Sequence, residues 1–168
     1  TAHGKAIAYS VNQFLRGAKT PADERLCRWI GAFVPEELMT LLTPDALTAL
    51  DVARLYDDAR AQFATARDLD PVNRDAYVYT KGYLAEGILT KLDRATMAVS
   101  LEARAPLLDP DFVKLAFAIP GHLKVRRGRL KHVFKQALAG LVPDEVLRRP
   151  KRGFALPIGR WFRDGMRE

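Results

Sequence analysis

Ile88–Asp109, with the sequence ILTKLDRATMAVSLEARAPLLD, places charges within a segment that is otherwise apolar. An ordinary core helix keeps its charges on one face, because an unpaired buried charge is very costly. Here acidic and basic residues come in near pairs on both sides of an expected helix–loop junction, and they are Lys91, Asp93, Arg94, Glu102, Arg104 and Asp109. The pattern predicts a fixed ion-pair network lining a polar ligand site.

Proline and capping signals outside this stretch predict a helical protein. Four residues with capping side chains stand directly before a proline: Thr20, Thr43, Asp70 and Asp109. The apolar spacing after these starts is helical, and Gly140 is placed like a helix stop. We expect helices at 21–33, 35–42, 44–67, 71–85, 87–99, 110–118, 130–139, 143–148 and 157–164. Only Leu123–Val125 reads as extended, so the expected fold class is all-α.

Length and composition are those of one globular domain over residues 1–168, with 48% hydrophobic residues and no apolar run long enough to span a membrane. Cys27 is the only cysteine, so no internal disulfide forms and a cytoplasmic location is expected. A small buried side chain fits Cys27 better than a nucleophile does. The first residue is Thr1, and we therefore expect the chain to be a piece of a longer protein.

The net charge of +7 is concentrated at one end of the chain. Residues 121–168 hold 13 Lys and Arg against 4 Asp and Glu, whereas residues 1–120 hold 14 basic and 16 acidic groups. Such a basic segment favours nucleic acid, an acidic membrane surface or a phosphate-bearing small molecule as a partner. No interleaving of aromatic and basic residues indicates a platform for single-stranded nucleic acid.

Three motifs in one order resemble the synthetase domain of glutamine-hydrolysing asparagine synthetases. Residues 91–109 resemble the family's KxDRxxMxxSxEARxPxLD segment, and LKVRRGRLKHVFKQAL (123–138) and VPDEVLRRPKRGFALPIGRWF (142–162) follow. The resemblance covers roughly residues 70–165, while residues 1–69 resemble only the variable helical stretch before the motif. It implies the helical C-terminal portion of an α/β synthetase domain of the PP-loop ATP pyrophosphatase type, similar to adenine-nucleotide alpha-hydrolases.

The resemblance also implies roles for particular residues. Lys131 aligns with the lysine that reaches the reacting centre from the start of a helix, where a cation stabilises negative charge in phosphoryl transfer. An arbitrary lysine would simply be solvated. The charged residues that would orient the substrate, directly or through a neighbour, are Asp93, Arg94, Glu102 and Arg104. The alternative for these four is a structural ion-pair network between the helix and the following loop.

Basic residues near the end of the chain form two clusters. Arg126, Arg127 and Arg129 flank Gly128 in an expected turn, which either attracts phosphate (Arg126 and Arg129) or only aids solubility. The RRPKRGF segment (148–154) resembles the family's RPKxGF loop, with Phe154 as its apolar anchor. The histidines have no spacing typical of a zinc site, so no metal ligand is expected in this chain.

The implied reaction of the full-length enzyme uses ATP and Mg²⁺ to activate the side-chain carboxylate of aspartate, and ammonia from glutamine then forms the amide. The chain contains no SGGxDS loop and no SGxGxDE segment. We therefore expect it to need the glutaminase and PP-loop regions of the same protein as partners. Alone, the chain is expected to bind no cofactor and to be inactive. We also expect the isolated chain to self-associate.

Three other functions remain open from the residues. The first is a basic helical module that binds nucleic acid, and the second is an amidotransferase of the same family that acts on a different carboxylate. The third is a degenerate family member with a structural role. The resemblance favours neither nucleic acid nor a membrane as a partner.

Overall fold

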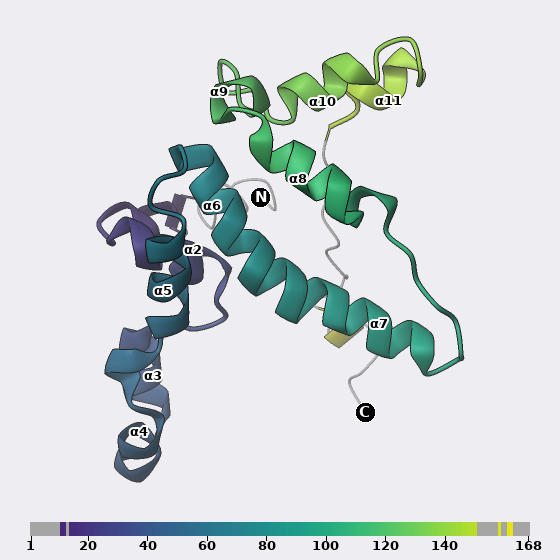
Figure 1. Cartoon of the computed structure of the whole chain (residues 1–168). Helices are drawn as coiled ribbons and strands as arrows, with labels where there is room; N and C mark the ends of the chain where they lie inside the picture. Colours follow the sequence, from purple (N-terminus) through teal and green to yellow (C-terminus); the bar gives the residue numbers. More distant parts are fainter. Residues whose placement is uncertain (1–10, 13, 151–157, 159–160, 163–168) are drawn as a thin grey trace. The chain divides into compact units, whose positions relative to one another are not determined.

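The computed structural model describes residues 11, 12, 14–150, 158, 161 and 162. Helices dominate these residues (Figure 1), and their β pairing is limited to two isolated bridges, Arg126 with Arg129 and Ala139 with Val142. The expected all-α class is therefore confirmed. The chain divides into two compact units between Leu130 and Lys131. Within the described residues, no helix is both long and apolar enough to cross a bilayer.

Short helices form the start of the first unit. They are α2 (Ala22–Ile30), α3 (Pro35–Leu41), α4 (Pro44–Leu50), a 3₁₀ turn (Val52–Arg54) and α5 (Asp57–Thr65). The single helix expected over 44–67 is wrong, because Asp51 adopts a left-handed backbone with φ 47° and ends α4. Aspartate tolerates this conformation better than most residues, and the sequence carries no glycine or proline there to signal the break.

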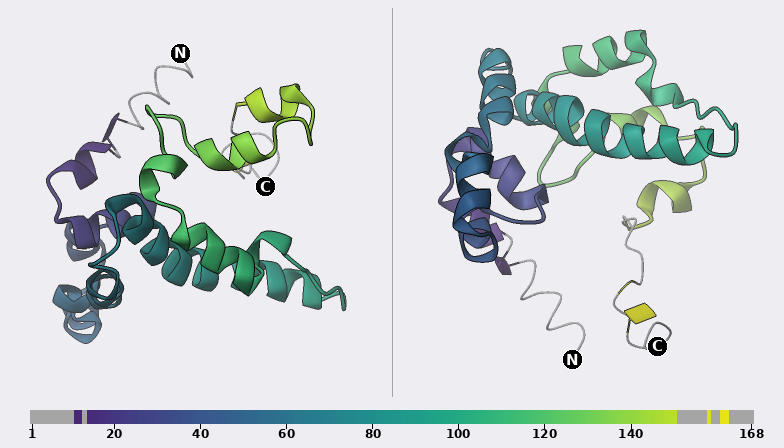
Figure 2. Two further views of the ribbon diagram at one scale, coloured as in Figure 1. Left: turned by 45° about the horizontal axis from the view of Figure 1, so that its top comes forward. Right: turned by 90° about the horizontal axis from the view of Figure 1, so that it is seen from below.

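A long helical run follows, and Figures 1 and 2 show it as one rod. It comprises α6 (Pro71–Tyr79), a π-helical segment (Thr80–Leu89) and α7 (Thr90–Met97). The break expected between residues 85 and 87 is absent. Gly87 does not end the helix, since the wider π turns carry the backbone through it. The side chain of Thr90 donates to the carbonyl of Ala85 at 3.0 Å at the return to α geometry.

The remaining elements of the first unit are a 3₁₀ turn (Pro106–Leu108), α8 (Pro110–Ala118) and α9 (Gly121–Lys124). As expected, Asp109 caps α8 by accepting from the amides of Asp111 (2.9 Å) and Phe112 (3.2 Å). The extended segment expected at Leu123–Val125 is wrong for its first two residues, which complete the single turn of α9. Val125 alone is extended.

The second unit contains α10 (His132–Ala137) and α11 (Asp144–Arg148) among its described residues. Gly140 has φ 80° and ends the α10 region, as its position predicts. The helix expected over 157–164 falls mainly outside the described residues. Within that range the structure describes residues 158, 161 and 162, and these are helical.

Packing in the first unit joins α2 to α5, α5 to α6 and α6 to α9. Ion pairs connect the early helices, including Arg60 with Glu24 at 2.8 Å. Trp29 stacks on Phe14 with ring centroids 6.5 Å apart but stays 40% exposed. Cys27 is half-buried, and burial raises the pKa of its thiol, which fits the expected packing role.

Few apolar side chains are buried among the described residues, and the buried ones are Val34, Tyr56, Ala66 and Val78. In contrast, Val99 is 75% exposed and Leu101 60% exposed in the loop after α7. Large apolar side chains with this degree of exposure are costly to leave in water.

We therefore expect this chain, when purified alone, to self-associate through the loop after α7. Replacing Leu101 with glutamate adds a charge to that loop and should shift the equilibrium toward monomer, whereas Lys114→Glu on α8 should not. Sedimentation equilibrium over a range of concentrations measures the change. A strict monomer at high concentration would contradict the prediction.

Candidate functional site

The charged residues predicted around the α7 junction are exposed to solvent. Asp93 and Arg94 lie on α7 with exposed side chains, and no ion pair of either is found among the described residues. Glu102 and Arg104 form one ion pair at 2.7 Å, with side chains 68% and 83% exposed. The predicted fixed network is thus reduced, in this part of the chain, to one exposed pair, and such a pair contributes little to stability.

The end of α7 determines where Glu102 and Arg104 lie. Ser100 adopts φ 57°, and two hydrogen bonds close the helix: Leu101 N–H to Thr96 O (3.0 Å) and Ser100 N–H to Met97 O (3.0 Å). This is the Schellman arrangement, with serine at the position that glycine usually occupies. The chain then leaves the helix, so the pair stands in an exposed loop without regular secondary structure.

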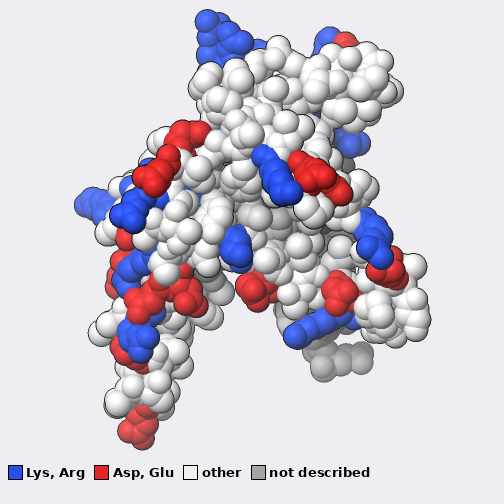
Figure 3. Space-filling model, in the orientation of Figure 1, with Lys and Arg blue, Asp and Glu red and all other residues white. Residues whose placement is uncertain are grey.

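A tight turn presents arginines directly after α9. Arg126 and Arg129 exchange two backbone hydrogen bonds of 3.1 and 2.9 Å, while Arg127 (φ 49°) and Gly128 (φ 75°) form the corner. Two positive φ values mark a type I′ turn, which requires a residue such as Gly128. The expected turn is confirmed, and we call residues 126–129 the arginine turn. Figure 3 shows Lys and Arg atoms projecting beside the segment labelled α9 in Figure 1.

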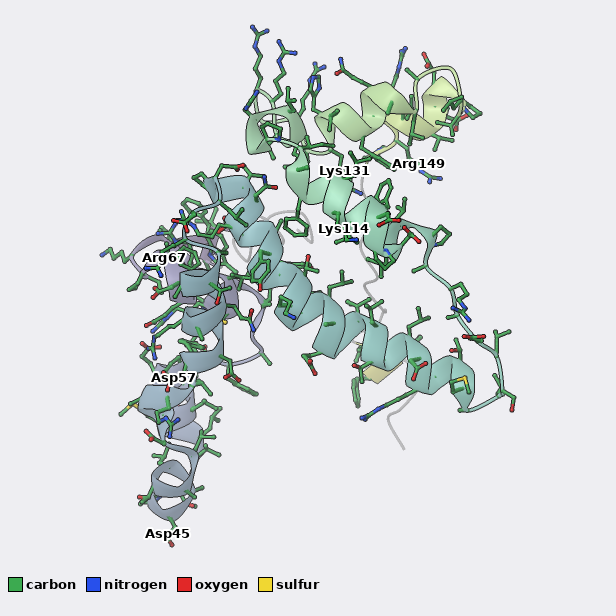
Figure 4. All side chains as sticks on the ribbon, viewed as in Figure 1. Asp45, Asp57, Arg67, Lys114, Lys131 and Arg149 are labelled. Atoms are coloured by element: carbon green, nitrogen blue, oxygen red, sulfur yellow. The ribbon has the colours of Figure 1, made fainter. Side chains whose placement is uncertain are left out.

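Lys131 stands at the start of α10, as the motif predicts, but its backbone is unusual. It is the residue before the first turn, labelled in Figure 4. Its backbone has φ 57° and ψ 34°. Its carbonyl accepts from Lys135 N–H at 2.9 Å, and its side chain is exposed. Long side chains rarely adopt this conformation, and such residues are frequent at functional sites. Lys131 belongs to the second unit, and the other predicted residues that the structure describes belong to the first.

The basic segment 148–154 is described only at its start. Arg148 on α11 pairs with Asp144 at 2.5 Å, and both side chains are exposed. Arg149 is exposed. Lys151, Arg152 and the expected anchor Phe154 lie outside the described residues.

A polar node that the sequence did not reveal lies just before the arginine turn. Asp70 caps α6 by accepting from Val72 N–H (3.0 Å) and Asn73 N–H (3.1 Å), and it also accepts from Gly121 N–H at 3.0 Å. Asn73 donates to Asp70 at 2.7 Å and accepts from the ammonium of Lys124. We call Asp70, Asn73, Gly121 and Lys124 the polar node. Only the cap by Asp70 carried a sequence signal, because the other partners lie 51 residues away.

Electrostatics follow from these contacts. Burial works to raise the pKa of Asp70, but hydrogen bonds donated by Asn73, Gly121 and Val72 outweigh it and hold the pKa below its usual value. Burial lowers the pKa of Lys124, and the charge of Asp70 opposes that shift.

Acid should therefore weaken the polar node. Because the folded pKa of Asp70 is depressed, its stabilisation is present above the unfolded value of 3.8 and is lost as the pH falls through the folded pKa. We expect the difference in unfolding free energy between the wild type and Asp70→Asn to be constant from about pH 7 to about pH 5 and to shrink below about pH 4. Urea unfolding followed by circular dichroism measures it. An equal difference at all pH values would contradict the role of the charge.

The described residues contain no group of three or more His, Cys, Asp and Glu that could hold a metal ion. The exposed arginines and Lys131 can neutralise phosphate oxygens, and the Glu102–Arg104 pair can hold an ammonium or a carboxylate.

Comparison with known proteins identifies relatives of the chain. It is 35% identical over 135 residues to asparagine synthetase [glutamine-hydrolyzing] 1 of Bacillus subtilis. This alignment covers 80% of the chain and 20% of the relative. It is 41% identical over 103 residues to a Mycobacterium bovis protein that is named as a glutamine-hydrolyzing asparagine synthetase. This alignment covers 61% of the chain and 16% of the relative. The human asparagine synthetase is 32% identical over 80 residues, covering 44% of the chain and 14% of the relative.

The chain thus spans a fifth or less of the length of these relatives. No solved structure matches it significantly. The family described as Asparagine synthase matches residues 5–168, nearly the whole chain. The chain therefore belongs to the asparagine synthase family, as its three motifs predict.

Proposed function

We propose that this chain is part of an ATP-dependent amidotransferase that converts aspartate and glutamine to asparagine and glutamate. The observation that carries the proposal is the family match over residues 5–168, together with relatives that are named as glutamine-hydrolysing asparagine synthetases. Exposed basic side chains in both units, in the arginine turn and at Lys131, support a role at an anionic substrate.

The proposed reaction has two steps. An oxygen of the aspartate side-chain carboxylate bonds to the α-phosphorus of ATP, and the bond to the β-phosphate oxygen breaks to release pyrophosphate. Ammonia from glutamine then attacks the acyl carbon of this aspartyl-adenylate, and AMP leaves with the bonding electron pair. Both steps gather negative charge on phosphate oxygens, so cations held near them lower the barrier.

Each predicted residue has a role in this proposal. Lys131 stabilises charge on the reacting phosphate, and Arg126 and Arg129 hold the outer phosphates. The pocket wall is formed by Asp93, Arg94, Glu102 and Arg104. Guanidinium groups suit phosphate oxygens because their donors form a planar fork. The proposal assigns no residue of this chain to Mg²⁺.

The proposal predicts different activities for the full-length protein and for this chain. The full-length protein should form asparagine from aspartate, glutamine and Mg-ATP, and it should catalyse aspartate-dependent exchange between ATP and pyrophosphate. This chain alone should do neither. ATP–pyrophosphate exchange catalysed by the isolated chain would contradict the prediction that this chain is inactive without the rest of the protein. A full-length protein that forms an amide only with another carboxylate would assign it to a different amidotransferase.

The basic charge of residues 121–168 keeps nucleic acid as the second candidate ligand. The affinity of a nucleic-acid-binding protein for DNA falls steeply as the salt concentration rises, because binding releases counterions from the phosphate backbone. Titration of duplex and single-stranded DNA at several salt concentrations separates the two functions. We expect weak binding without a steep slope.

A further inference from the structure

The polar node lies one residue from the arginine turn and fixes the backbone that leads into it. Helix α9 runs from Gly121 to Lys124, and both of its ends belong to the node. Val125 N–H then donates to Gly121 O at 2.9 Å, and the turn begins at the next residue. The start of the turn is therefore set by contacts with α6, which lies about 50 residues earlier in the chain.

Asn73 is the centre of the polar node and is only 4% exposed. Its amide nitrogen donates to Asp70 (2.7 Å) and to the carbonyl of Ile119 (3.0 Å), and its amide oxygen accepts from Lys124. A buried amide with both ends bonded holds one orientation, because turning it would leave polar atoms unpaired. Asn73 thereby joins the end of α8 to the end of α9.

Gly121 permits the close approach between the two segments. A Cβ atom at this position would lie 2.0 Å from a carboxylate oxygen of Asp70 and 2.7 Å from Cβ of Val72. Gly121 is buried, so no other side chain could be accommodated without separating α9 from α6.

Lys124 differs from the neighbouring arginines. Its ammonium bonds to Asn73 and lies 5.3 Å from the ring centroid of Phe117, so it points into the protein. Arg126 and Arg129 are exposed. Lys124 thus contacts α6, and Arg126 and Arg129 have exposed side chains.

We infer that Asp70 and Asn73 are positioning residues that act through Gly121 and Lys124 to hold the arginine turn against the phosphates of ATP. The inference rests on the proposed function, in which Arg126 and Arg129 hold those phosphates. Removing the node lets the turn move, and the arginines then lose their alignment with the substrate. The affinity for ATP falls while the chemistry of bound substrate is preserved.

Steady-state kinetics of the full-length protein test the inference. Asn73→Ala and Lys124→Met should each raise the KM for ATP by about tenfold, the size expected for one lost hydrogen bond to a charged group, with kcat unchanged. Lys114→Met, on the exposed Lys114 of α8, is the matched control and should leave both constants unchanged. Adding Asn73→Ala to the double variant Arg126→Ala/Arg129→Ala should raise the KM no further, because the contacts that Asn73 positions are already absent.

Hydrogen exchange separates a failure of this inference from a failure of the proposed function. In full-length Asn73→Ala, the amides of Arg126 and Arg129 should exchange at least tenfold faster. Unchanged exchange at these amides, or a fall in kcat at constant KM, would overturn the inference. A normal KM for ATP in Arg129→Ala would overturn the proposed role of the arginines. Because this variant leaves the polar node unchanged, it tests that role independently of the node. If Asn73→Ala does not fold, Lys124→Met gives the same decision.

Discussion

Replacing Lys131 with alanine in the full-length protein is expected to reduce aspartate-dependent ATP–pyrophosphate exchange by about 10²–10³-fold, the cost of removing one group that stabilises transition-state charge. Hydrolysis of glutamine should continue, because it needs no phosphoryl transfer. The side chain of Lys131 is exposed, so its removal should leave the packing of the protein intact. Its backbone is in a left-handed conformation. Exchange and glutaminase rates measured on one preparation give both results.

Two other lysines provide controls for this prediction. Lys135→Ala changes an exposed lysine on the same helix, α10, and should leave exchange unchanged. Lys151→Ala tests the second basic segment, within residues 148–154. Loss of exchange in Lys151→Ala together with normal exchange in Lys131→Ala would contradict the assignment and move the catalytic lysine to that segment.

Gly121→Ala is expected to have the largest effect on stability. The added Cβ would meet the Asp70 carboxylate at 2.0 Å, and that carboxylate cannot move without breaking its hydrogen bonds to Val72, Asn73 and Gly121. We expect a loss of about 2–4 kcal/mol in the unfolding free energy of this chain, as for other overpacked sites that also break a buried network. Urea unfolding followed by circular dichroism measures the loss.

Gly82→Ala is the matched control for this change. Gly82 lies in the π-helical segment with nothing within 4 Å of an added Cβ, so alanine should be neutral or stabilise the helix by up to about 1 kcal/mol. Equal unfolding free energies for Gly121→Ala and Gly82→Ala would show that α9 is not held tightly against α6.

Local sequence signals predicted the helical class and several helix ends. The cap of α8 by Asp109 and the stop at Gly140 depend on neighbours within a few residues, and both are found where expected. Two boundaries were predicted wrongly: a break at Asp51 was missed, and a break expected between residues 85 and 87 is absent. Asp51 adopts a left-handed backbone that aspartate merely tolerates, and Gly87 lies within a π segment that has no sequence signature.

The candidate site was predictable only where a motif marks it. The arginine turn follows from Gly128 between arginines, and Lys131 from its motif. The polar node could not be predicted, because Asn73 and Lys124 stand 51 residues apart and each is ordinary in its own segment. The ionic pattern at residues 91–109 predicted a fixed ion-pair network, yet Glu102 and Arg104 form one exposed pair, since the Schellman end of α7 leads the chain into a loop without regular secondary structure.

Transfer of oxygen from the substrate carboxylate tests the central claim most directly. The full-length protein is supplied with aspartate carrying ¹⁸O in its side-chain carboxylate, with glutamine and ATP, and the nucleotide product is analysed by mass spectrometry. If the carboxylate attacks the α-phosphorus, AMP gains one ¹⁸O for each asparagine formed. Unlabelled AMP, or ¹⁸O in inorganic phosphate with ADP as the nucleotide product, would contradict the account.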